Sequence, residues 1–496
     1  MRHRIAALIA VAALAVIAWW LPHLRRTIIH AVVTYDAPAT EPAPLPGGAG
    51  PGLSKVARTR VILIDGLAAS VAKTLPVWSA LCKTGATLEI EVGFPTVSLP
   101  VEVALWTGLT QQQTGIVYRS GRPLSPPIDR HGIPAQVAGS WAVAENYGYI
   151  VRSLGFARVE PAAEPAKPGK DANPDAWALA WQSRALEAVQ SPAALVFVHI
   201  LRVDTAGHRH GIDAEYVKVA LEADAILKQM HGADPGARWF LLSDHGHIAS
   251  GGHGGEEPFV RHVQGCIVGP GVVVSKSGLV HAVDVARSIA DSTGATLDPA
   301  SRGRPLSAAM INPLTTDQGI PPMALGAGAI AIFIMVAGLG LSSWGVRRWW
   351  LAPWWFVIGC ATLLLWKGMP TLSTPMIYKP EGRDMYLAWL PALVVAATAA
   401  WAGMTRSTLS RVLVSQLALP FAAVAAVITA AGAWPVVLGT EMAPVVPRFT
   451  AWMSPLILIA AHGAAAVALG VLAISVRRWF GPRGPEAPPR TEPAAG

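Results

Sequence analysis

Short apolar runs alternate with amphipathic segments between residues 55 and 320. The runs are rich in β-branched residues and have the length of strands, whereas Ala176–Val189 and Ala214–Met230 carry apolar positions at helical spacing. This alternation is typical of an α/β layered domain with a mainly parallel sheet. The predicted strands are Thr59–Ile64, Thr87–Val92, Leu195–Leu201, Trp239–Leu242 and Gly265–Val268.

The hydrophobic pattern changes outside these residues, where long apolar stretches replace the short runs. Each has close to the ~20 residues that a helix needs to cross a bilayer. Residues 1–36 predict an N-terminal signal-anchor helix, because 5–20 are apolar and no good cleavage site follows; a cleaved signal peptide is the alternative. Residues 321–476 predict a membrane domain of about five helices, with spans near 323–344, 350–366, 385–404, 412–433 and 453–474.

Basic residues in alternate loops predict the orientation of these spans, since positively charged loops stay in the cytoplasm. Six spans with both termini inside place the domain at 55–320 on the extracytoplasmic side. Residues 37–54 are rich in Pro, Ala and Gly and predict a linker. The Pro-rich residues 477–496 predict a disordered cytoplasmic tail. The charged loop positions are Arg347, Arg348, Arg406, Arg411, Arg477 and Arg478.

The net charge of the chain is +8, but this charge is unevenly spread. Residues 55–320 carry 23 basic and 24 acidic side chains, so the positive excess belongs to the predicted membrane part. We therefore expect a membrane partner and no nucleic acid. The oligomeric state stays open.

Three cysteines are too few for a disulfide framework. Cys82 and Cys266 fall in the α/β domain, whereas Cys360 falls in a predicted span. A Cys82–Cys266 bridge requires an oxidising compartment, and we expect two separately buried thiols instead.

Polar side chains with metal-binding chemistry follow two of the predicted strands. Asp65 closes the run 61–64, where it is either a helix cap or an oxygen ligand aimed into a cleft. Asp204 and His208 follow the run 195–201 and are four residues apart, a spacing that lets both side chains meet one ion. His199 and His210 have no partner at an informative spacing, and we expect them to be structural.

A third group follows the run 239–242. Asp244 and His245 are adjacent, and His253 comes eight positions after His245 in a glycine-rich loop. Oxygen and nitrogen ligands of these kinds suit zinc. Together with the earlier groups they predict two divalent metal ions, which can hold the attacking and leaving oxygens of a displacement at phosphorus.

Ser98 is the candidate nucleophile. Pro100 suits the first turn of a helix through Val101–Trp106, which puts Ser98 at or just before the helix N-terminus. The free N–H groups there favour an anion such as phosphate. A plain Ser cap is the alternative reading of this position.

The motifs together resemble the alkaline phosphatase superfamily, in its type I phosphodiesterase and nucleotide pyrophosphatase branch. The short interval before the last His and the flanking membrane spans are similar to glycosylphosphatidylinositol ethanolamine phosphate transferases. The motifs are Asp65-Gly66, Pro95-Thr96-Val97-Ser98, Asp204-x-x-Gly207-His208 and Ser243-Asp244-His245-Gly246 followed by His253-Gly254.

The resemblance implies how the metal ligands are divided and which residue attacks. It implies that Asp204, His208 and His253 hold one ion, and that the second is held by Asp65, Asp244, His245 and the oxygen of Ser98. It implies Ser98 rather than Thr96 as the nucleophile, although many phosphodiesterase relatives use Thr there.

Arg119 occupies the position at which some relatives place an Asn that holds a phosphoryl oxygen. A guanidinium can grip that oxygen in a bidentate manner. A solvated loop Arg is the alternative reading.

The expected function is that of a membrane-anchored phosphoester hydrolase or phosphoryl transferase that forms a phosphoserine. Spans on both sides of the domain favour a lipid or lipid-linked substrate. A multispan transporter and a catalytically silent zinc-binding scaffold are the alternatives. Against a transporter, every Lys, Arg, Asp and Glu after residue 322 falls in or at the border of a loop, whereas transport pathways usually need ionisable groups within the bilayer.

Overall fold

The computed structural model describes residues 50–116, 124, 132–163, 176–249, 251–255 and 257–314, with residues 45–47 and single positions within 5–23 and 472–480. The five spans predicted after residue 322 apart from Leu472, most of the predicted anchor and tail, and Arg119 lie outside the described residues. Within the part of the chain that is described, no helix combines the length and apolarity needed to cross a membrane.

A mixed sheet of eight strands forms the centre of the described domain, in the order β4-β3-β5-β1-β6-β7-β2-β8. Neighbouring strands are parallel except for β7, which is antiparallel to both β6 and β2. The predicted α/β class with a mainly parallel sheet is confirmed. The strands are β1 (Thr59–Ile64), β2 (Ala86–Glu91), β3 (Trp141–Ala144), β4 (Arg158–Glu160), β5 (Leu195–Ile200), β6 (Arg238–Leu242), β7 (His262–Val268) and β8 (Ser275–His281).

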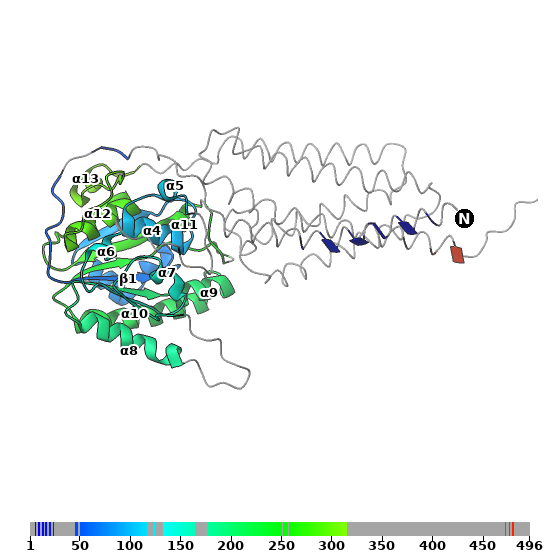
Figure 1. Ribbon diagram of the computed structural model, residues 1–496, viewed down its shortest axis with the longest axis horizontal. Coiled ribbons are helices and arrows are strands. Elements are labelled where there is room, and N and C mark those ends of the chain that lie inside the picture. The colour runs from blue at the N-terminus through cyan, green and yellow to red at the C-terminus, as the bar shows by residue number, and fades with distance from the viewer. Residues whose placement is uncertain are drawn as a thin grey trace, which may run out of the picture.

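Helices cover both faces of this sheet (Figure 1). In β1, Val61 and Leu63 pack into one core cluster, whereas Ile62 and Ile64 pack into the other. Burial on both faces explains why the strand is continuously apolar. One face carries α3 (Pro76–Cys82), α8 (Ala176–Gln190) and α10 (Ala214–Ala233), and the other carries α4 (Ser98–Thr107), α12 (Ala282–Thr293) and α13 (Leu306–Ile311).

The remaining described helices are short and lie in the connections. They are α2 (Ala69–Ala72), α5 (Gln111–Thr114), α6 (Ile133–Gln136), α7 (Gly148–Arg152), α9 (Arg202–His210) and α11 (Pro258–Arg261). Three strands escaped prediction, namely β3, β4 and β8. The first two have only four and three residues, and β8 begins with Ser-Lys-Ser-Gly rather than an apolar run.

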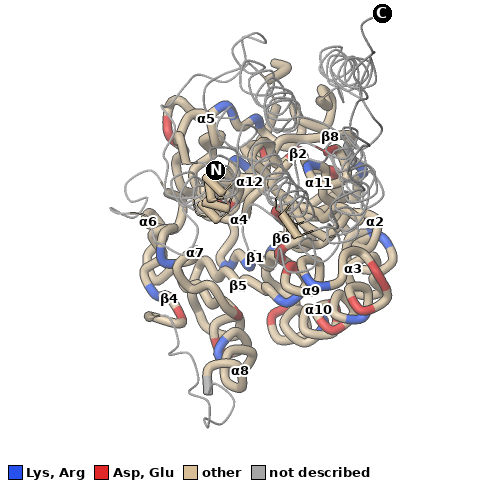
Figure 2. Tube along the Cα trace, turned by 90° about the vertical axis from the view of Figure 1, so that its right-hand side faces the viewer, with Lys and Arg blue, Asp and Glu red and all other residues tan. Residues whose placement is uncertain are grey.

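Helix α10 shows why the amphipathic segments form helices. Its N-cap residue Asp213 accepts hydrogen bonds from the backbone N–H groups of Glu215 and Tyr216, which fixes where the helix begins. Tyr216 and Leu227 are buried against the sheet. Acidic and basic residues lie along the outer side of α10 in Figure 2, as the predicted pattern requires.

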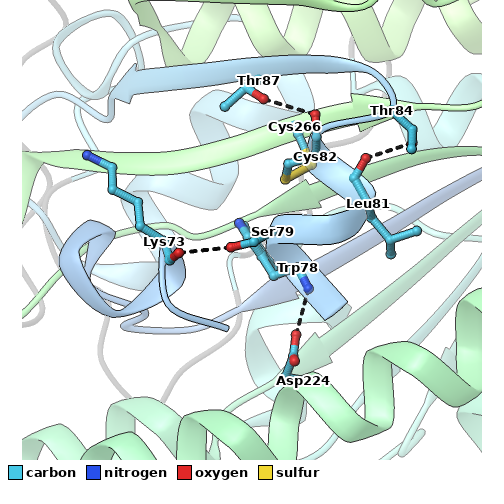
Figure 3. The surroundings of a disulfide bond; sticks show 9 residues. All are labelled: Lys73, Trp78, Ser79, Leu81, Cys82, Thr84, Thr87, Asp224 and Cys266. Carbon is cyan, nitrogen blue, oxygen red and sulfur yellow. Dashed lines mark hydrogen bonds between the residues drawn. A yellow bond between two sulfur atoms is a disulfide. The ribbon is translucent and has the colours of Figure 1, made fainter. Parts of the chain in front are cut away.

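Cys82 and Cys266 form a disulfide, so the expectation of two separate thiols is wrong (Figure 3). Cys82 ends α3 and Cys266 lies in β7, and their Cα atoms are 5.3 Å apart. The two are separated by 184 positions, so their proximity arises only because α3 packs against this strand.

The described end of the predicted linker is attached to the domain. Its backbone carbonyls have no strand or helix partner and therefore accept hydrogen bonds from side chains. Arg304 donates to the carbonyl of Pro46, and Arg238 donates to that of Ser54. Further contacts join Asn312 to Gly47, Ser307 to Pro51 and the Leu53 N–H to Asp291.

Candidate metal centre

The carboxyl ends of four strands meet at one edge of the sheet. β5, β1 and β6 are parallel neighbours, and β2 runs in the same direction because β7 is antiparallel to both β6 and β2. Each end leads directly into a segment with candidate ligands. Asp65 follows β1, α9 follows β5, Asp244 and His245 follow β6, and the loop after β2 leads into α4.

Ser98 is the first residue of α4, as predicted from Pro100. The first N–H groups of a helix have no acceptor within the helix and favour a negatively charged group. Ser98 is half-buried, whereas the helix residues that follow it are buried. Ser98 is therefore the least enclosed of the first residues of this helix.

Four of the predicted ligands form what we call the serine cluster. Ser98 Oγ lies 3.3 Å from Asp65 Oδ1 and 3.4 Å from His245 Nε2. His245 Nε2 also lies 3.3 Å from both Asp65 Oδ1 and Asp244 Oδ2. The members are Asp65, Ser98, Asp244 and His245.

The other three predicted ligands form the histidine cluster, which consists of Asp204, His208 and His253. Helix α9 places Asp204 and His208 one turn apart, with Oδ1 and Nε2 separated by 3.4 Å. His253 Nε2 lies 3.5 Å from Asp204 Oδ1 and 3.0 Å from His208 Nε2. The two clusters are adjacent, because the rings of His245 and His253 stack with centroids 3.7 Å apart.

These spacings fit bound metal ions. Four ligands at zinc distances of about 2.0–2.1 Å in a tetrahedron are separated from one another by roughly 3.3–3.4 Å. Oxygen and nitrogen atoms of the serine cluster are 3.3–3.4 Å apart, and two of the three separations in the histidine cluster are 3.4 and 3.5 Å. One buried oxygen of each carboxylate accepts no well-aligned hydrogen bond and faces only imidazole nitrogens, namely Asp65 Oδ2, Asp204 Oδ1 and Asp244 Oδ2. Such orphaned oxygens suit a cation.

The ring hydrogens of two imidazoles are also placed for metal binding. His253 Nδ1–H donates to the backbone carbonyl of Thr96 at 2.7 Å, and His245 Nδ1–H donates to that of Gly246 at 3.1 Å. With the hydrogen on Nδ1, the neutral ring presents the lone pair of Nε2 to the cluster.

Electrostatics in the serine cluster favour a cation. Burial opposes ionisation of Asp65, but hydrogen bonds from His199 and His245 hold its pKa below the ordinary value of an aspartate. Burial and the charge of Asp65 raise the pKa of Asp244 well above its usual range. Burial would lower the pKa of His245, yet Asp244 and Asp65 together raise it to about 10. The two buried carboxylates thus resist carrying both of their charges at once, a conflict that a bound cation would relieve.

The histidine cluster differs, because its His253 imidazole resists protonation. Burial, with the charge of His245, lowers the pKa of His253 well below its usual value, so this ring is neutral at neutral pH. Neutral imidazole is the form that binds metal. Burial opposes ionisation of Asp204, but the charge of His208 and a hydrogen bond from His247 hold its pKa well below that of a free aspartate.

Three residues near the clusters escaped sequence analysis. His199 was expected to be structural and without a partner, but its Nε2 lies 3.1 Å from Asp65 Oδ2 and 3.0 Å from Glu102 Oε1. Glu102 is the sole charge in the apolar helix α4, one turn after Ser98, and this was the signal that could have indicated it. The third is His247, whose Nε2 lies 3.2 Å from Asp204 Oδ1.

No protein-family model matches the chain, and no curated protein matches it. Among similar solved structures, human ectonucleotide pyrophosphatase/phosphodiesterase 5 gives a TM-score of 0.41 at 12% identity, covering 51% of this chain and 99% of the human one. A protein in the alkaline phosphatase superfamily from Vibrio parahaemolyticus gives 0.38 at 13% identity, covering 59% and 78%. The C-terminal periplasmic domain of Escherichia coli EptC, solved with zinc, gives 0.35 at 13% identity, covering 56% and 92%.

One of these structures is of a protein in the alkaline phosphatase superfamily, and another is of a pyrophosphatase/phosphodiesterase. At these identities and TM-scores, what this chain does has to be inferred from its own side chains.

Proposed function

We propose that this chain is a membrane-anchored enzyme with two divalent metal ions, most suitably zinc, that cleaves or transfers a phosphoester group through a phosphoserine at Ser98. The observation that carries the proposal is the spacing within the serine cluster, where a half-buried hydroxyl lies 3.3–3.4 Å from a carboxylate and an imidazole. A hydroxyl at ligand distance from a carboxylate and an imidazole is the arrangement of an activated nucleophile.

The serine cluster would hold one ion and the histidine cluster the other. When bound, these ions supply positive charge for the attacking and leaving oxygens. Ser98 Oγ–H donates towards Asp65 Oδ1, so Asp65 orients the hydroxyl. As the oxygen attacks phosphorus, the hydroxyl proton passes to solvent water. The bond to the leaving oxygen breaks, and the phosphoryl group is carried on Ser98.

The N-terminus of α4 then stabilises the charge on the phosphoserine. Water or an acceptor alcohol attacks the same phosphorus, and the Ser98 oxygen leaves with a proton. With water as the acceptor the enzyme is a hydrolase, and with an alcohol it is a transferase. The first half of the reaction is the same for the two enzymes. Arg119 is proposed, by its sequence position alone, to grip a phosphoryl oxygen.

We propose a lipid or lipid-linked phosphoester as the substrate class and an extracytoplasmic position for the domain. Predicted spans on both sides of residues 55–320 support a site held near the bilayer. The Cys82–Cys266 disulfide supports the extracytoplasmic position, because structural disulfides persist in oxidising compartments.

The test uses purified full-length protein loaded with zinc, assayed on monoester and diester chromogens and then on a lipid extract. We expect Ser98→Ala to abolish turnover while zinc content and thermal unfolding stay at wild-type values. Ser79→Ala is the matched control, because its hydroxyl bonds only the carbonyl of Lys73 among the described contacts. Near wild-type turnover in Ser98→Ala would remove the serine from the mechanism, and stoichiometric zinc without any phosphoester cleavage would instead favour a silent scaffold.

A further inference from the structure

His247 occupies a slot between the two clusters that glycine makes possible. The ring is fully buried, and its centroid lies 5.3 Å from that of His208, 5.6 Å from that of His245 and 5.4 Å from that of His253. A Cβ on Gly207 would lie 2.6 Å from His247 Cε1 and closer still to Nε2. These separations are far below van der Waals contact, so only glycine fits there.

Gly66 forms the other wall of the slot. Its φ of +69° is a conformation that favours glycine, and a Cβ there would lie 2.7 Å from His247 Nε2. The two glycines that adjoin Asp65 and His208 in the sequence motifs therefore make room for the same imidazole.

The hydrogen bond on the far side of the ring determines what Nε2 can do. The backbone N–H of Gly252 donates to His247 Nδ1 at 3.1 Å. A nitrogen that accepts cannot also carry the hydrogen, so the neutral ring has its hydrogen on Nε2. Nε2 lies 3.2 Å from Asp204 Oδ1, and neither atom has a well-aligned hydrogen-bond partner among the described residues. With its hydrogen on Nε2, the ring can only donate towards this oxygen.

His247 is thus the reverse of the two neighbouring imidazoles. His245 and His253 donate through Nδ1 and present a lone pair at Nε2, as metal ligands do. His247 accepts at Nδ1 and presents a hydrogen at Nε2. The position of the ring hydrogen therefore distinguishes the two metal ligands from His247, which supports a ligand, although all three rings lie close to the carboxylates.

We propose that His247 is a positioning residue for the metal centre, whose Nε2–H holds Asp204 Oδ1 so that this oxygen faces His208 and His253. The inference rests on the two-metal site proposed above. A carboxylate oxygen has a second lone pair, so Asp204 can accept this hydrogen bond and bind an ion at the same time.

Two substitutions separate the two nitrogens of His247. In His247→Asn, the side-chain oxygen occupies the position of Nδ1 and still accepts from Gly252, but no donor reaches Asp204. In His247→Gln, the amide nitrogen is as many bonds from Cα as Nε2 and restores the donor to Asp204. Both variants remain polar and neither supplies an imidazole.

The measurements are zinc stoichiometry and affinity, by competition with a chromogenic chelator, and the visible absorption of the cobalt-substituted protein. We expect His247→Asn to bind the more weakly held ion about 10–100-fold less tightly, the usual effect of removing an outer partner of a ligand, and to shift the cobalt bands. We expect His247→Gln to recover most of the affinity. Thermal unfolding of the metal-free proteins reports any effect on the fold alone.

Each other outcome overturns the inference in a recognisable way. If His247 were itself a ligand, Gln would weaken zinc binding as much as Asn does. If its role were only to fill space, both variants would unfold at lower temperature without a change in zinc affinity or cobalt spectrum. If the wild-type protein binds no zinc, both the two-metal proposal and this inference are wrong. If the wild type binds zinc fully and His247→Asn has the same zinc affinity and cobalt spectrum, only the positioning role is wrong.

Discussion

The backbone carbonyl of Thr96 accepts a hydrogen bond from His253 Nδ1–H at 2.7 Å. The contact joins the loop that leads to Ser98 with the glycine-rich loop that carries the last predicted ligand, 157 positions away. The Thr96 side chain strengthens the connection, because its hydroxyl donates to the carbonyl of Gly255 at 2.9 Å and accepts from the N–H of Gly254 at 2.8 Å. Thr96 therefore aligns His253 without being a ligand.

Replacement of Thr96 by Val should loosen this alignment. Val keeps the branched shape and the backbone carbonyl but loses both hydroxyl hydrogen bonds, so the buried Gly254 N–H loses the acceptor that Thr96 supplies. We expect zinc affinity to fall about 10-fold or more and the unfolding free energy by about 1–3 kcal/mol. Chelator competition and chemical denaturation measure the two effects.

Thr87→Val is the matched control for that substitution. Thr87 lies in β2 and its hydroxyl donates to the carbonyl of Cys82, away from both clusters. It should lower stability slightly and leave zinc affinity unchanged. Equal zinc affinity in the Thr96 and Thr87 variants would show that the hydroxyl of Thr96 does not align the ligand loop.

Gly207→Ala and Gly232→Ala should have opposite effects on stability. Both glycines lie within helices, where Ala is ordinarily better by about 1 kcal/mol. A Cβ at Gly232 meets nothing within 4 Å, so we expect that variant to be more stable. A Cβ at Gly207 would overlap the rigid ring of His247, so we expect lower stability and weaker zinc binding.

Thermal unfolding and zinc titration of the two glycine variants provide the measurement. A Gly207→Ala protein with unchanged zinc affinity and raised unfolding temperature would mean that the imidazole does not occupy the slot.

The disulfide should contribute substantially to stability, because it closes a long loop across the domain. Cys82 and Cys266 are separated by 184 positions, and removal of such a bridge typically costs about 2–5 kcal/mol. We expect Cys82→Ala/Cys266→Ala to unfold at lower temperature than the oxidised wild type. A reducing agent should lower the wild-type unfolding temperature towards that of the double variant and leave the double variant unaffected.

Labelling with a maleimide checks the pairing directly. Both cysteines of the unfolded protein should react only after reduction. Quantitative labelling without reductant would show that they are separate thiols, as the sequence alone suggested.

Glu91 should give the domain an acid-sensitive contribution to stability. Its carboxylate accepts from Arg261 Nε at 2.9 Å and lies 3.0 Å from His262 Nε2. Burial opposes ionisation, but these partners lower the pKa of Glu91 from 4.5 to about 2. Because the pKa of this carboxyl is lower in the folded than in the unfolded state, Glu91 stabilises the folded protein at pH values above about 4.5. This stabilisation is lost as the pH falls from about 4.5 towards 2.

Denaturant unfolding of wild type and Glu91→Gln across this pH range measures the effect. Above pH 5 we expect the wild type to be more stable by up to about 3 kcal/mol, since each pKa unit corresponds to about 1.4 kcal/mol. The difference should shrink on acidification below pH 4.5. Glu89→Gln is the control, because Glu89 is exposed on the same strand; a pH-independent difference for Glu91→Gln would contradict the assignment.

Local patterns were sufficient for much of the fold. The β-branched run at Thr59–Ile64 predicts β1 with the bounds that the structure has, and the Pro100 signal places Ser98 at the start of α4. Both features depend on neighbours in the chain, the first on a continuous run of apolar and β-branched residues and the second on helix geometry. The short strands β3 and β4 carry too few residues for such a pattern.

The sequence also determined which residues have ligand chemistry and that they follow strand ends. The four-residue spacing of Asp204 and His208 corresponds to one turn of α9. Residues within the helix are sufficient to determine such a spacing. The grouping of seven residues into two adjacent clusters followed from the direction of β1, β2, β5 and β6, because their carboxyl ends share one edge.

Only the tertiary structure decided which other residues take part. Glu102 and His199 meet because α4 covers one face of β5, and Cys82 meets Cys266 because α3 covers the other face of β7. The role of His247 depends on an N–H group five residues away and on two glycines from different elements. Such contacts arise from the packing of layers, whose register no single stretch of sequence encodes, whereas strand ends and helix turns are set by the residues beside them.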